Sequence, residues 1–260
     1  MKNIRNLLFT VIVSLVSNAF VLAQPSTANP NLFLVREDKV KPSMVSTYES
    51  ALADLKLILD EVNDLKIPYF CHIQDDFCFT HVIPVNSIED VENLKIDRLV
   101  ERLNRPELFL VYDDLCSAVE STRYYMFKYD PDLSYVPESQ SWIDKMQYRK
   151  WSFYYFYPGT QDEVRKILLA WRALYAKNNV ARGFRVFEGY LGTEQPMLIF
   201  TNWAESPADH QEKLNQTMEK LGEEGSALWM ATMEYVRDVR VVEGWFLPQY
   251  SYTLGLKLAE

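Results

Sequence analysis

The stretch PSMVSTYESALADLKLILDEV, from Pro42 to Val62, decides the fold because it has a counterpart later in the chain. Its apolar residues recur at the spacing of one helix face, which predicts an amphipathic helix. A second stretch, PGTQDEVRKILLAWRALY, runs from Pro158 to Tyr175, at a shift of 116 residues. At that shift the apolar positions coincide: Tyr48 with Val164, Ala51 with Ile167, Leu52 with Leu168, Leu55 with Trp171, Ile58 with Leu174 and Leu59 with Tyr175. The chain therefore repeats one helix in register.

Strand patterns surround both helices in the same order. Runs of about four to eight β-branched and aromatic residues between turn residues are typical of strands. In the first half we predict strands at 31–40, 68–74, 77–85 and 123–129, and helical segments at 87–104 and 106–119. In the second half we predict strands at 151–157, 183–191, 197–203 and 237–246, and helical segments at 206–222 and 227–235. With its long helix, each half has the order strand, helix, strand, strand, helix, strand.

The boundary between the halves lies in a segment without sustained periodicity. Residues 131–147 carry Pro131 and Pro137 among several Ser and Asp residues, a composition typical of a linker. We therefore predict a first α+β unit over 31–130, a linker over 131–147 and a second α+β unit over 148–260.

The fold class follows from what each unit leaves uncovered. A βαββαβ unit covers one face of its sheet with two helices, and the other face needs a partner. We predict an α+β fold in which two tandem ferredoxin-like βαββαβ units form one pseudo-dimeric α+β barrel. The alternative is two independent ferredoxin-like domains, but each would then expose a large apolar sheet face.

This order and length of elements resembles the dimeric α+β barrel superfamily. That group contains antibiotic-biosynthesis-monooxygenase, chlorite-dismutase-like and NIPSNAP-like proteins. The resemblance covers most of the chain after residue 30, in element order and length only. No signature motif accompanies it, so it assigns no role to any residue. It implies a barrel with helices outside, and it is compatible with a cofactor-independent oxygenase or a haem-handling protein.

The first residues predict the destination of the chain. Lys2 and Arg5 precede an apolar run from Leu7 to Ala23, the layout of a secretory signal peptide cleaved after Ala23. The alternative is a retained membrane anchor, but the run contains Asn18 and is shorter than the roughly 20 apolar residues that a spanning helix needs. We therefore predict a signal peptide over 1–23, a disordered leader over 24–30 and a secreted or periplasmic protein without a membrane span after cleavage.

Composition restricts the partners of the chain. The formal net charge is −9, and removal of Lys2 and Arg5 makes it more negative, so we expect no binding to nucleic acid. An internal duplication removes the usual need to pair two chains, which is compatible with a monomer. The three cysteines, Cys71, Cys78 and Cys116, are either buried thiols or include a Cys116 disulfide to one of the other two.

Two histidines are the first candidates for a site. A hairpin that turns at residues 75–76 would pair position 72 with 79 and position 70 with 81. Alternation then puts Phe70, His72, Phe79 and His81 on one face, directed into the barrel. Such histidines could ligate a metal or haem or act as a general base. The alternative is two hydrogen-bonded histidines at a wet barrel mouth, and no carboxylate cluster nearby completes a metal set, so we predict no metal site.

The second half adds aromatic and polar candidates. Its ligand-binding candidates are Tyr155, Tyr157, Glu188, Asn202 and Trp203, of which Glu188 takes the place of His72 at the shift of 116. Aromatic rows of this kind would hold a flat apolar ligand, although ordinary core packing is the commoner reason for them. The third histidine, His210, lies in a polar helix opening, and we expect it to be solvated.

No sequence motif identifies a reaction. The chain has no G-x-S-x-G, no Walker loop, no G-x-G-x-x-G and no H-E-x-x-H motif, so no catalytic residue or cofactor is assigned. We expect a protein that binds a small apolar or aromatic ligand in the barrel interior. The alternatives are an oxygenase or haem-handling enzyme that uses His72 and His81, and a structural or interaction module with a filled barrel.

Overall fold

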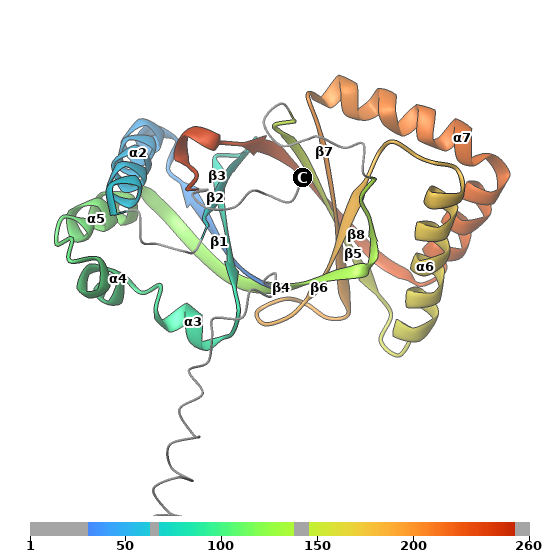
Figure 1. Ribbon diagram of the computed structural model, residues 1–260, viewed down its shortest axis with the longest axis horizontal. Coiled ribbons are helices and arrows are strands. Elements are labelled where there is room, and N and C mark those ends of the chain that lie inside the picture. The colour runs from blue at the N-terminus through green and yellow to red at the C-terminus, as the bar shows by residue number, and fades with distance from the viewer. Residues whose placement is uncertain (1–30, 63–67, 138–145, 253–260) are drawn as a thin grey trace, which may run out of the picture.

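The computed structural model describes residues 31–62, 68–137 and 146–252. The predicted signal peptide (1–23) and leader (24–30) lie outside the described residues and stay predictions. The described chain forms an antiparallel sheet of eight strands that closes into a barrel, with helices on its outside (Figure 1). The prediction of a closed α+β barrel is therefore confirmed.

The strands follow one another around the barrel in the order β1-β3-β2-β8-β5-β7-β6-β4. The first four in the chain are β1 (Leu32–Val40), β2 (Phe70–Gln74), β3 (Cys78–Val85) and β4 (Val119–Tyr135). The last four are β5 (Tyr148–Phe156), β6 (Phe184–Gly189), β7 (Met197–Ala204) and β8 (Val236–Phe246). The first half thus has the sheet order β4-β1-β3-β2, and the second half has the corresponding order β8-β5-β7-β6.

Two seams join the halves into one sheet. At the first seam β2 pairs with β8 through three residue pairs: His72 with Phe246, Ile73 with Trp245 and Gln74 with Gly244. At the second seam β4 pairs with β6, from Phe127 opposite Gly189 to Tyr135 opposite Phe184. A closed sheet leaves no free edge for pairing with another chain. The two seams therefore complete the barrel, and the first is the shorter of the two.

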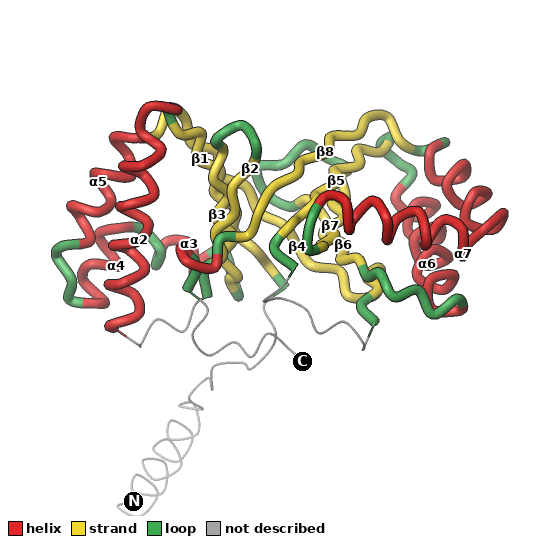
Figure 2. Tube along the Cα trace, turned by 90° about the horizontal axis from the view of Figure 1, so that it is seen from above, coloured by secondary structure: helices red, strands yellow, loops and turns green. Residues whose placement is uncertain are grey.

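Helices cover the outer face in two layers on opposite sides of the barrel (Figures 1 and 2). The first layer contains a 3-10 turn (Pro42–Met44), α2 (Val45–Val62), α3 (Glu89–Glu92), α4 (Ile96–Leu103) and α5 (Leu108–Ala118). The second layer contains α6 (Gln161–Lys177) and α7 (Pro207–Met233), and a 3-10 turn (Pro248–Tyr250) follows β8.

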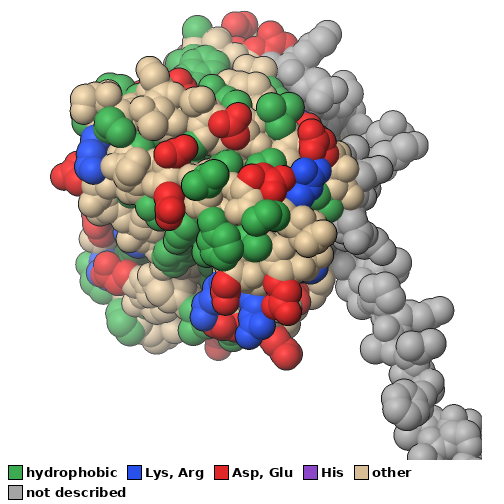
Figure 3. Space-filling view, turned by 90° about the vertical axis from the view of Figure 1, so that its left-hand side faces the viewer, with side chains coloured by type: hydrophobic (Ala, Val, Ile, Leu, Met, Phe, Trp, Pro, Cys, Tyr) green, Lys and Arg blue, Asp and Glu red, His purple; other side chains and the backbone are tan. Residues whose placement is uncertain are grey.

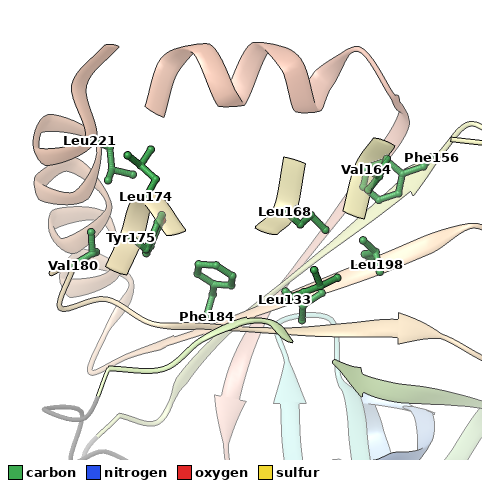
Figure 4. Packing of buried hydrophobic residues seen from close by; sticks show 11 residues of the cluster. Leu133, Phe156, Val164, Leu168, Leu174, Tyr175, Val180, Phe184, Leu198 and Leu221 are labelled. Carbon is green, nitrogen blue, oxygen red and sulfur yellow. The ribbon is translucent and has the colours of Figure 1, made fainter. Parts of the chain in front are cut away.

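The second layer packs against its half of the sheet through an apolar core. Leu168 and Leu174 of α6 and Leu221 of α7 meet Phe184 and Leu198 from the strands (Figure 4). Each fully buried Leu or Phe side chain contributes about 1.5–3 kcal/mol relative to exposure. This core therefore holds the second layer firmly on the barrel.

Side chains fill the inside of the barrel. Alternate strand residues point inward, and Val35, Tyr125, Phe127, Phe153 and Ile199 occupy the middle of the barrel. The cavity that remains there has a volume of about 60 Å³. A cavity that holds one benzene-sized ligand has a volume of about 150 Å³. The expectation of an apolar ligand inside the barrel therefore finds no support in this volume.

Several elements differ from their predicted bounds, and the differences at β4 and at the segment 87–104 are the largest. Strand β4 runs over Val119–Tyr135 rather than 123–129, so it includes the start of the predicted linker, whose residues 138–145 lie outside the described chain. The helical segment predicted at 87–104 is two helices, α3 and α4. Helix α7 contains the expected break, since Gly222 has non-helical angles (φ 52°, ψ −136°). Within the three described ranges, no helix is both long enough and apolar enough to cross a bilayer.

Candidate functional site

The register of the β2–β3 hairpin separates the two candidate histidines. His72 lies opposite Thr80, and Phe70 lies opposite Val82, one residue away from the predicted pairing. The connection between the strands contains three residues because Phe77 takes a left-handed conformation (φ 62°). A shift of one residue turns a side chain to the other face of a strand. The prediction that the four residues share one face was therefore wrong.

Each histidine consequently has its own environment. Phe70 and His72 point into the barrel, where His72 packs at 5.1 Å against Trp151 and at 5.3 Å against Phe246. Phe79 and His81 point outward to the first helix layer, where Phe79 packs on Tyr48 of α2. His81 lines a cavity on this outer side.

The outer-side site is built on Asp38, a fully buried carboxylate on β1. Arg36, two residues earlier on the same face, holds it with two contacts of 2.8 Å, from Nε to Oδ1 and from Nη2 to Oδ2. The hydroxyl groups of Tyr48 and Thr122 each donate a hydrogen bond of 2.7 Å to it. Buried charges are tolerated when they are paired and hydrogen-bonded in this way.

The ion pair fixes both charge states. Burial alone would raise the pKa of Asp38, but the charge and hydrogen bond of Arg36, together with His81 and the Thr122 hydroxyl, hold that pKa below its usual range. Burial alone would lower the pKa of Arg36, but the Asp38 carboxylate raises it. Asp38 is therefore an anion and Arg36 a cation at neutral pH, and their charges cancel within the site.

His81 connects this pair to a second tyrosine. Its Nε2 lies 2.7 Å from the Tyr48 hydroxyl, and its Nδ1 lies 2.6 Å from the Tyr69 hydroxyl. The Tyr69 ring also stacks on the imidazole, with centroids 5.4 Å apart. Burial, more than any charge, lowers the pKa of His81 to about 4, so the ring is neutral.

The direction of each hydrogen bond follows from the single proton on each hydroxyl. Tyr48 donates its proton to Asp38, so its oxygen accepts the Nε2–H of His81. The Nδ1 of His81 then has a lone pair, which accepts the proton of Tyr69. The result is a chain of donors from Tyr69 through His81 and Tyr48 to Asp38. We call these four residues the outer relay.

A cavity of about 150 Å³ adjoins the outer relay. It lies between the sheet and helices α2, α4 and α5, and its lining is mainly aliphatic, with Leu52, Leu55, Leu99 and Leu115 among the residues. The polar side chains in the lining are Arg36, Asp38, Tyr48, Tyr69, His81 and Tyr112. An apolar cavity of this volume can hold a single aromatic ring.

The outer surface of this helix layer is mixed. Figure 3 shows hydrophobic side chains interspersed with acidic and a few basic ones on that face. Leu110 of α5 and Leu57 of α2 are 70% and 61% exposed. Isolated exposed apolar residues are normal on soluble proteins. The distinctive chemistry of this layer is therefore on its inner side.

The second half has no counterpart of the outer relay. At the shift of 116 residues, Ser152 stands in place of Arg36, Tyr154 in place of Asp38 and Val164 in place of Tyr48. Phe200 stands in place of His81, because Phe200 lies opposite Ser152 on the neighbouring strand just as His81 lies opposite Arg36. Tyr154, Val164 and Phe200 belong to the apolar core under α6 and α7. The two halves share a sheet order but differ in what lies beneath their helices.

The remaining candidates do not meet in one place. Tyr155 points into the barrel near Phe153, whereas Tyr157 is 52% exposed beyond the end of β5. Asn202 bonds the carbonyl of Gly183, and Glu188 lies 3.9 Å from Arg165 at the surface. Trp203 is buried beside the Arg185 guanidinium. Of the nine predicted residues, only His81 belongs to the outer-side site.

Sequence reasoning missed most of the outer relay. Arg36 and Asp38 lie in a strand that reads as half solvent-facing, and Tyr48 was assigned only to the helix core. Tyr69 precedes β2, where alternation gives little information. The one available signal was an Arg and an Asp two residues apart, which share a strand face and can form an ion pair.

The third histidine was also misplaced. His210, expected to be solvated, is 4% exposed, with its Nε2 2.9 Å from Nη2 of Arg182 and its ring against Tyr148. Burial, followed by the charge of Arg182, lowers its pKa to about 4. The side chain faces inward because it lies one turn into α7, on the face that packs on the sheet.

The histidines do not suit a haem group. Both ring nitrogens of His81 are engaged by tyrosine hydroxyls, which leaves no lone pair for iron. The adjoining cavity of about 150 Å³ is also small for a macrocycle. His72 lies inside the barrel between Trp151 and Phe246, and the barrel cavity that Trp151 lines has a volume of only about 60 Å³. Among the described residues, no three His, Cys, Asp or Glu side chains cluster as a metal site would require.

The three thiols are unpaired. Cys71 and Cys78 are buried, and Cys116 is exposed. Burial raises the pKa of Cys78 to about 12, so this thiol stays protonated and unreactive.

Comparison with known proteins places the fold. No protein-family model matches the chain, and no curated protein does. Among solved structures, an anthrone oxidase-like protein matches with a TM-score of 0.57 and 16% identity over 89% of this chain and 97% of that one.

Two further solved structures match a similar share of the chain. A putative monooxygenase from Lactobacillus acidophilus NCFM matches with a TM-score of 0.56 and 6% identity, over 86% of this chain and 96% of its own. A chlorite dismutase from Candidatus Nitrospira defluvii matches with a TM-score of 0.52 and 10% identity, over 86% and 93%. These similarities support a fold related to the dimeric α+β barrel proteins, and at such identities they show the fold alone.

Proposed function

We propose that the protein binds a small neutral molecule, of about one aromatic ring with one polar group, in the cavity beside the outer relay. The observation that carries this proposal is an apolar cavity of about 150 Å³ with a buried, hydrogen-bonded polar wall. Ligand pockets combine an apolar lining with a few placed polar groups, and this cavity has that composition.

The polar wall favours a neutral ligand over an ion. Arg36 and Asp38 neutralise each other at 2.8 Å, and His81 is uncharged. The Tyr69 oxygen donates to His81 and keeps lone pairs, so it can accept a hydrogen bond from the ligand. A phenol-like hydroxyl fits this arrangement, whereas a carboxylate would lose its hydration without gaining an unpaired cation.

Binding of three one-ring probes tests the proposal. Phenol, toluene and benzoate are titrated into the purified protein and followed by ligand-observed NMR. We expect phenol to bind more tightly than toluene, and benzoate to be the weakest competitor for bound phenol, which restricts the comparison to this cavity. Leu99→Phe adds a ring to the cavity lining and should abolish phenol binding. The control is Leu169→Phe, at a leucine of α6 that is 40% exposed and distant from the cavity lining. Equal phenol affinity in the two variants would contradict the proposal.

A second candidate function is a cofactor-independent oxygenase. Two observations favour it: the outer relay is a hydrogen-bonded chain that begins at the cavity wall with Tyr69, and several structural neighbours are named oxidase-like or monooxygenase. In that reaction a ring CH2 group and one O2 would give a carbonyl group and one water. Oxygen consumption that requires a ring substrate and falls in Tyr69→Phe would support it. Substrate-independent consumption would exclude it.

We further propose that the chain is exported after cleavage behind Ala23 and folds as two tandem ferredoxin-like units in a monomer. The N-terminal sequence layout supports export. The corresponding sheet orders β4-β1-β3-β2 and β8-β5-β7-β6 support the duplication. N-terminal sequencing of the exported protein should begin at Gln24, and light scattering should give the mass of one chain.

A further inference from the structure

The inner surface of the barrel carries a second set of polar side chains, which do not line the cavity beside the outer relay. Arg149 on β5 lies opposite Gly244 of β8 and beside Trp203 of β7. Its guanidinium lies 5.4 Å from the centre of the Phe246 ring, and the same ring packs on His72 at 5.3 Å. Arg149 and His72 therefore share one wall at the end of the barrel where β5 begins. This place is on the opposite side of the sheet from His81.

Arg149 has no anionic partner among the described residues. Its Nη1 donates hydrogen bonds to the carbonyls of Met146 and Tyr148, and no Asp or Glu of the described chain forms an ion pair with it. The charged group that acts on it is another cation, Arg185. Burial and then this like charge lower the pKa of Arg149 to about 10. A half-buried cation without a counter-charge among the described residues has lost part of its hydration without an ion pair in return, so its retention needs an explanation.

His72 supplies an independent observation. The side chain is 7% exposed, and its Nδ1 has no hydrogen-bond partner. Burial lowers its pKa well below the usual value, and the charge of Arg149 contributes to the lowering. Buried side-chain nitrogens in native proteins nearly always have a partner, so an orphan at this position indicates a missing group.

We propose that this end of the barrel binds an oxyanion, which the Arg149 guanidinium holds and which faces the Nδ1 of His72. A planar guanidinium matches the geometry of carboxylate, sulfate and phosphate oxygens. The anion would supply the counter-charge that Arg149 lacks, and His72 would gain a hydrogen-bond partner. Trp151 and Phe246 would enclose the anion and exclude water.

This site is independent of the proposed ligand cavity. Its residues come from β2, β5 and β8, whereas the outer relay comes from β1, α2, the residue before β2 and β3. The failure of either proposal therefore leaves the other standing.

Oxyanion titration of the purified protein tests the proposal. Sulfate, phosphate and benzoate are added at millimolar concentration, with chloride holding the ionic strength constant. Binding is read from Trp fluorescence, since Trp151 packs on His72, and from thermal unfolding. We expect a saturable response to at least one oxyanion and none to chloride. Saturation by sulfate or phosphate alone assigns an inorganic ion, and saturation by benzoate alone assigns an organic carboxylate.

Arginine variants show whether the response to oxyanions comes from the proposed site at Arg149. Arg149→Gln should weaken binding at least tenfold. The matched control is Arg172→Gln, at an α6 arginine whose Nη1 bonds the carbonyl of Asp132 at the surface, and it should leave the affinity unchanged. If Arg149→Gln does not fold, Arg149→Lys keeps the charge and should still weaken binding. No saturable response to any oxyanion, or the same affinity in the Arg149 variant, would overturn the proposal.

A spectroscopic readout separates the site from general salt effects. On oxyanion binding, the 15N resonance of His72 Nδ1 should shift, because this atom gains a partner. The resonances of His81, whose two nitrogens are already engaged, should stay in place. Equal shifts in both histidines would indicate a general effect and count against the site.

Discussion

Asp38 organises the first helix layer through the bonds it accepts. Three side chains converge on its two oxygens, and one of them, Tyr48, passes the connection on to His81. Hydrogen bonds to a charged group contribute more than neutral ones, roughly 1.5–3 kcal/mol each. The outer relay therefore stabilises the fold as well as lining the proposed ligand cavity. Removal of a single hydroxyl group from it should lower the free energy of unfolding.

Removal of the Tyr48 hydroxyl tests this contribution. Tyr48→Phe leaves the ring in the core but deprives Asp38 of a donor and His81 of an acceptor. We expect a loss of about 1–3 kcal/mol in the free energy of unfolding, measured by urea titration. The control is Tyr157→Phe, at a tyrosine that is 52% exposed, with an expected change near zero. Equal losses in the two variants would show that the hydroxyl of Tyr48 contributes nothing specific.

The buried histidines predict how stability depends on pH. The pKa of His81 is about 4 in the folded protein and about 6.5 when unfolded, so the unfolded state binds more protons between these values. The contribution of His81 is complete above pH 6.5 and is lost as the pH falls toward 4. His210, also at about 4, acts in the same direction.

We expect the free energy of unfolding to fall by about 1.5 kcal/mol per histidine between pH 6.5 and pH 5. Urea titrations at several pH values measure this slope. In His81→Gln the slope should be shallower, although the variant is less stable at pH 7. An unchanged slope would mean that His81 does not remain neutral in the folded state.

The β2–β3 hairpin shows at the level of one element how a short turn decides a site. The turn places one residue, Phe77, in a left-handed conformation, and the three-residue connection sets which face each histidine takes. Alternation along a strand is visible in the sequence, but the length of the turn is not fixed by it. That single residue explains why His72 and His81 were assigned to one face.

A pair of substitutions at Phe77 tests this turn. The ring is 43% exposed, so both Phe77→Ala and Phe77→Gly remove little buried surface. A left-handed backbone costs a residue with a Cβ about 1–2 kcal/mol, and glycine avoids that cost. We expect the glycine variant to be more stable than the alanine variant by about 1 kcal/mol in urea unfolding. The opposite order would show that residue 77 is not left-handed in solution.

At the scale of the whole molecule, closure depends on two seams. The β2–β8 seam rests on three residue pairs, and Gly244 lies in one of them. A Cβ added at Gly244 would lie 2.3 Å from the backbone oxygen of Ile73, which cannot move without opening the seam. At the other seam, a Cβ on Gly189 would meet only the ends of flexible side chains, those of Thr193, Gln195 and Met197.

We therefore expect Gly244→Ala to destabilise the barrel by more than about 2 kcal/mol, within the range of severe core substitutions. Gly189→Ala should cost less, because its neighbours can turn away. Thermal unfolding gives the stabilities, and hydrogen exchange of the Ile73 amide reports the seam. Equal costs for the two variants, with unchanged exchange at Ile73, would contradict a strained β2–β8 closure.

The closed barrel was predictable, whereas most of the site was not. The prediction of a closed α+β barrel rested on the apolar positions that match after Pro42 and Pro158, and on the sheet face that each unit leaves uncovered. Both can be read from the sequence, because helix periodicity is visible within a single local stretch. The outer relay joins β1, α2 and β3 through pairs such as Tyr48 with His81, which lie 33 residues apart. Only the packed structure brings those atoms within hydrogen-bond distance.

The contrast between the two helix layers has a consequence for how this chain can change. A pair of identical subunits would have to accept every substitution twice, once on each side of the barrel. Here one polypeptide encodes both sides, so the face with Asp38 can carry a buried ion pair while the matching positions on the face with Leu168 are apolar core. In a single joined chain, the two sides of the barrel can therefore accept different substitutions, so one side can change its polar residues while the other keeps its apolar packing.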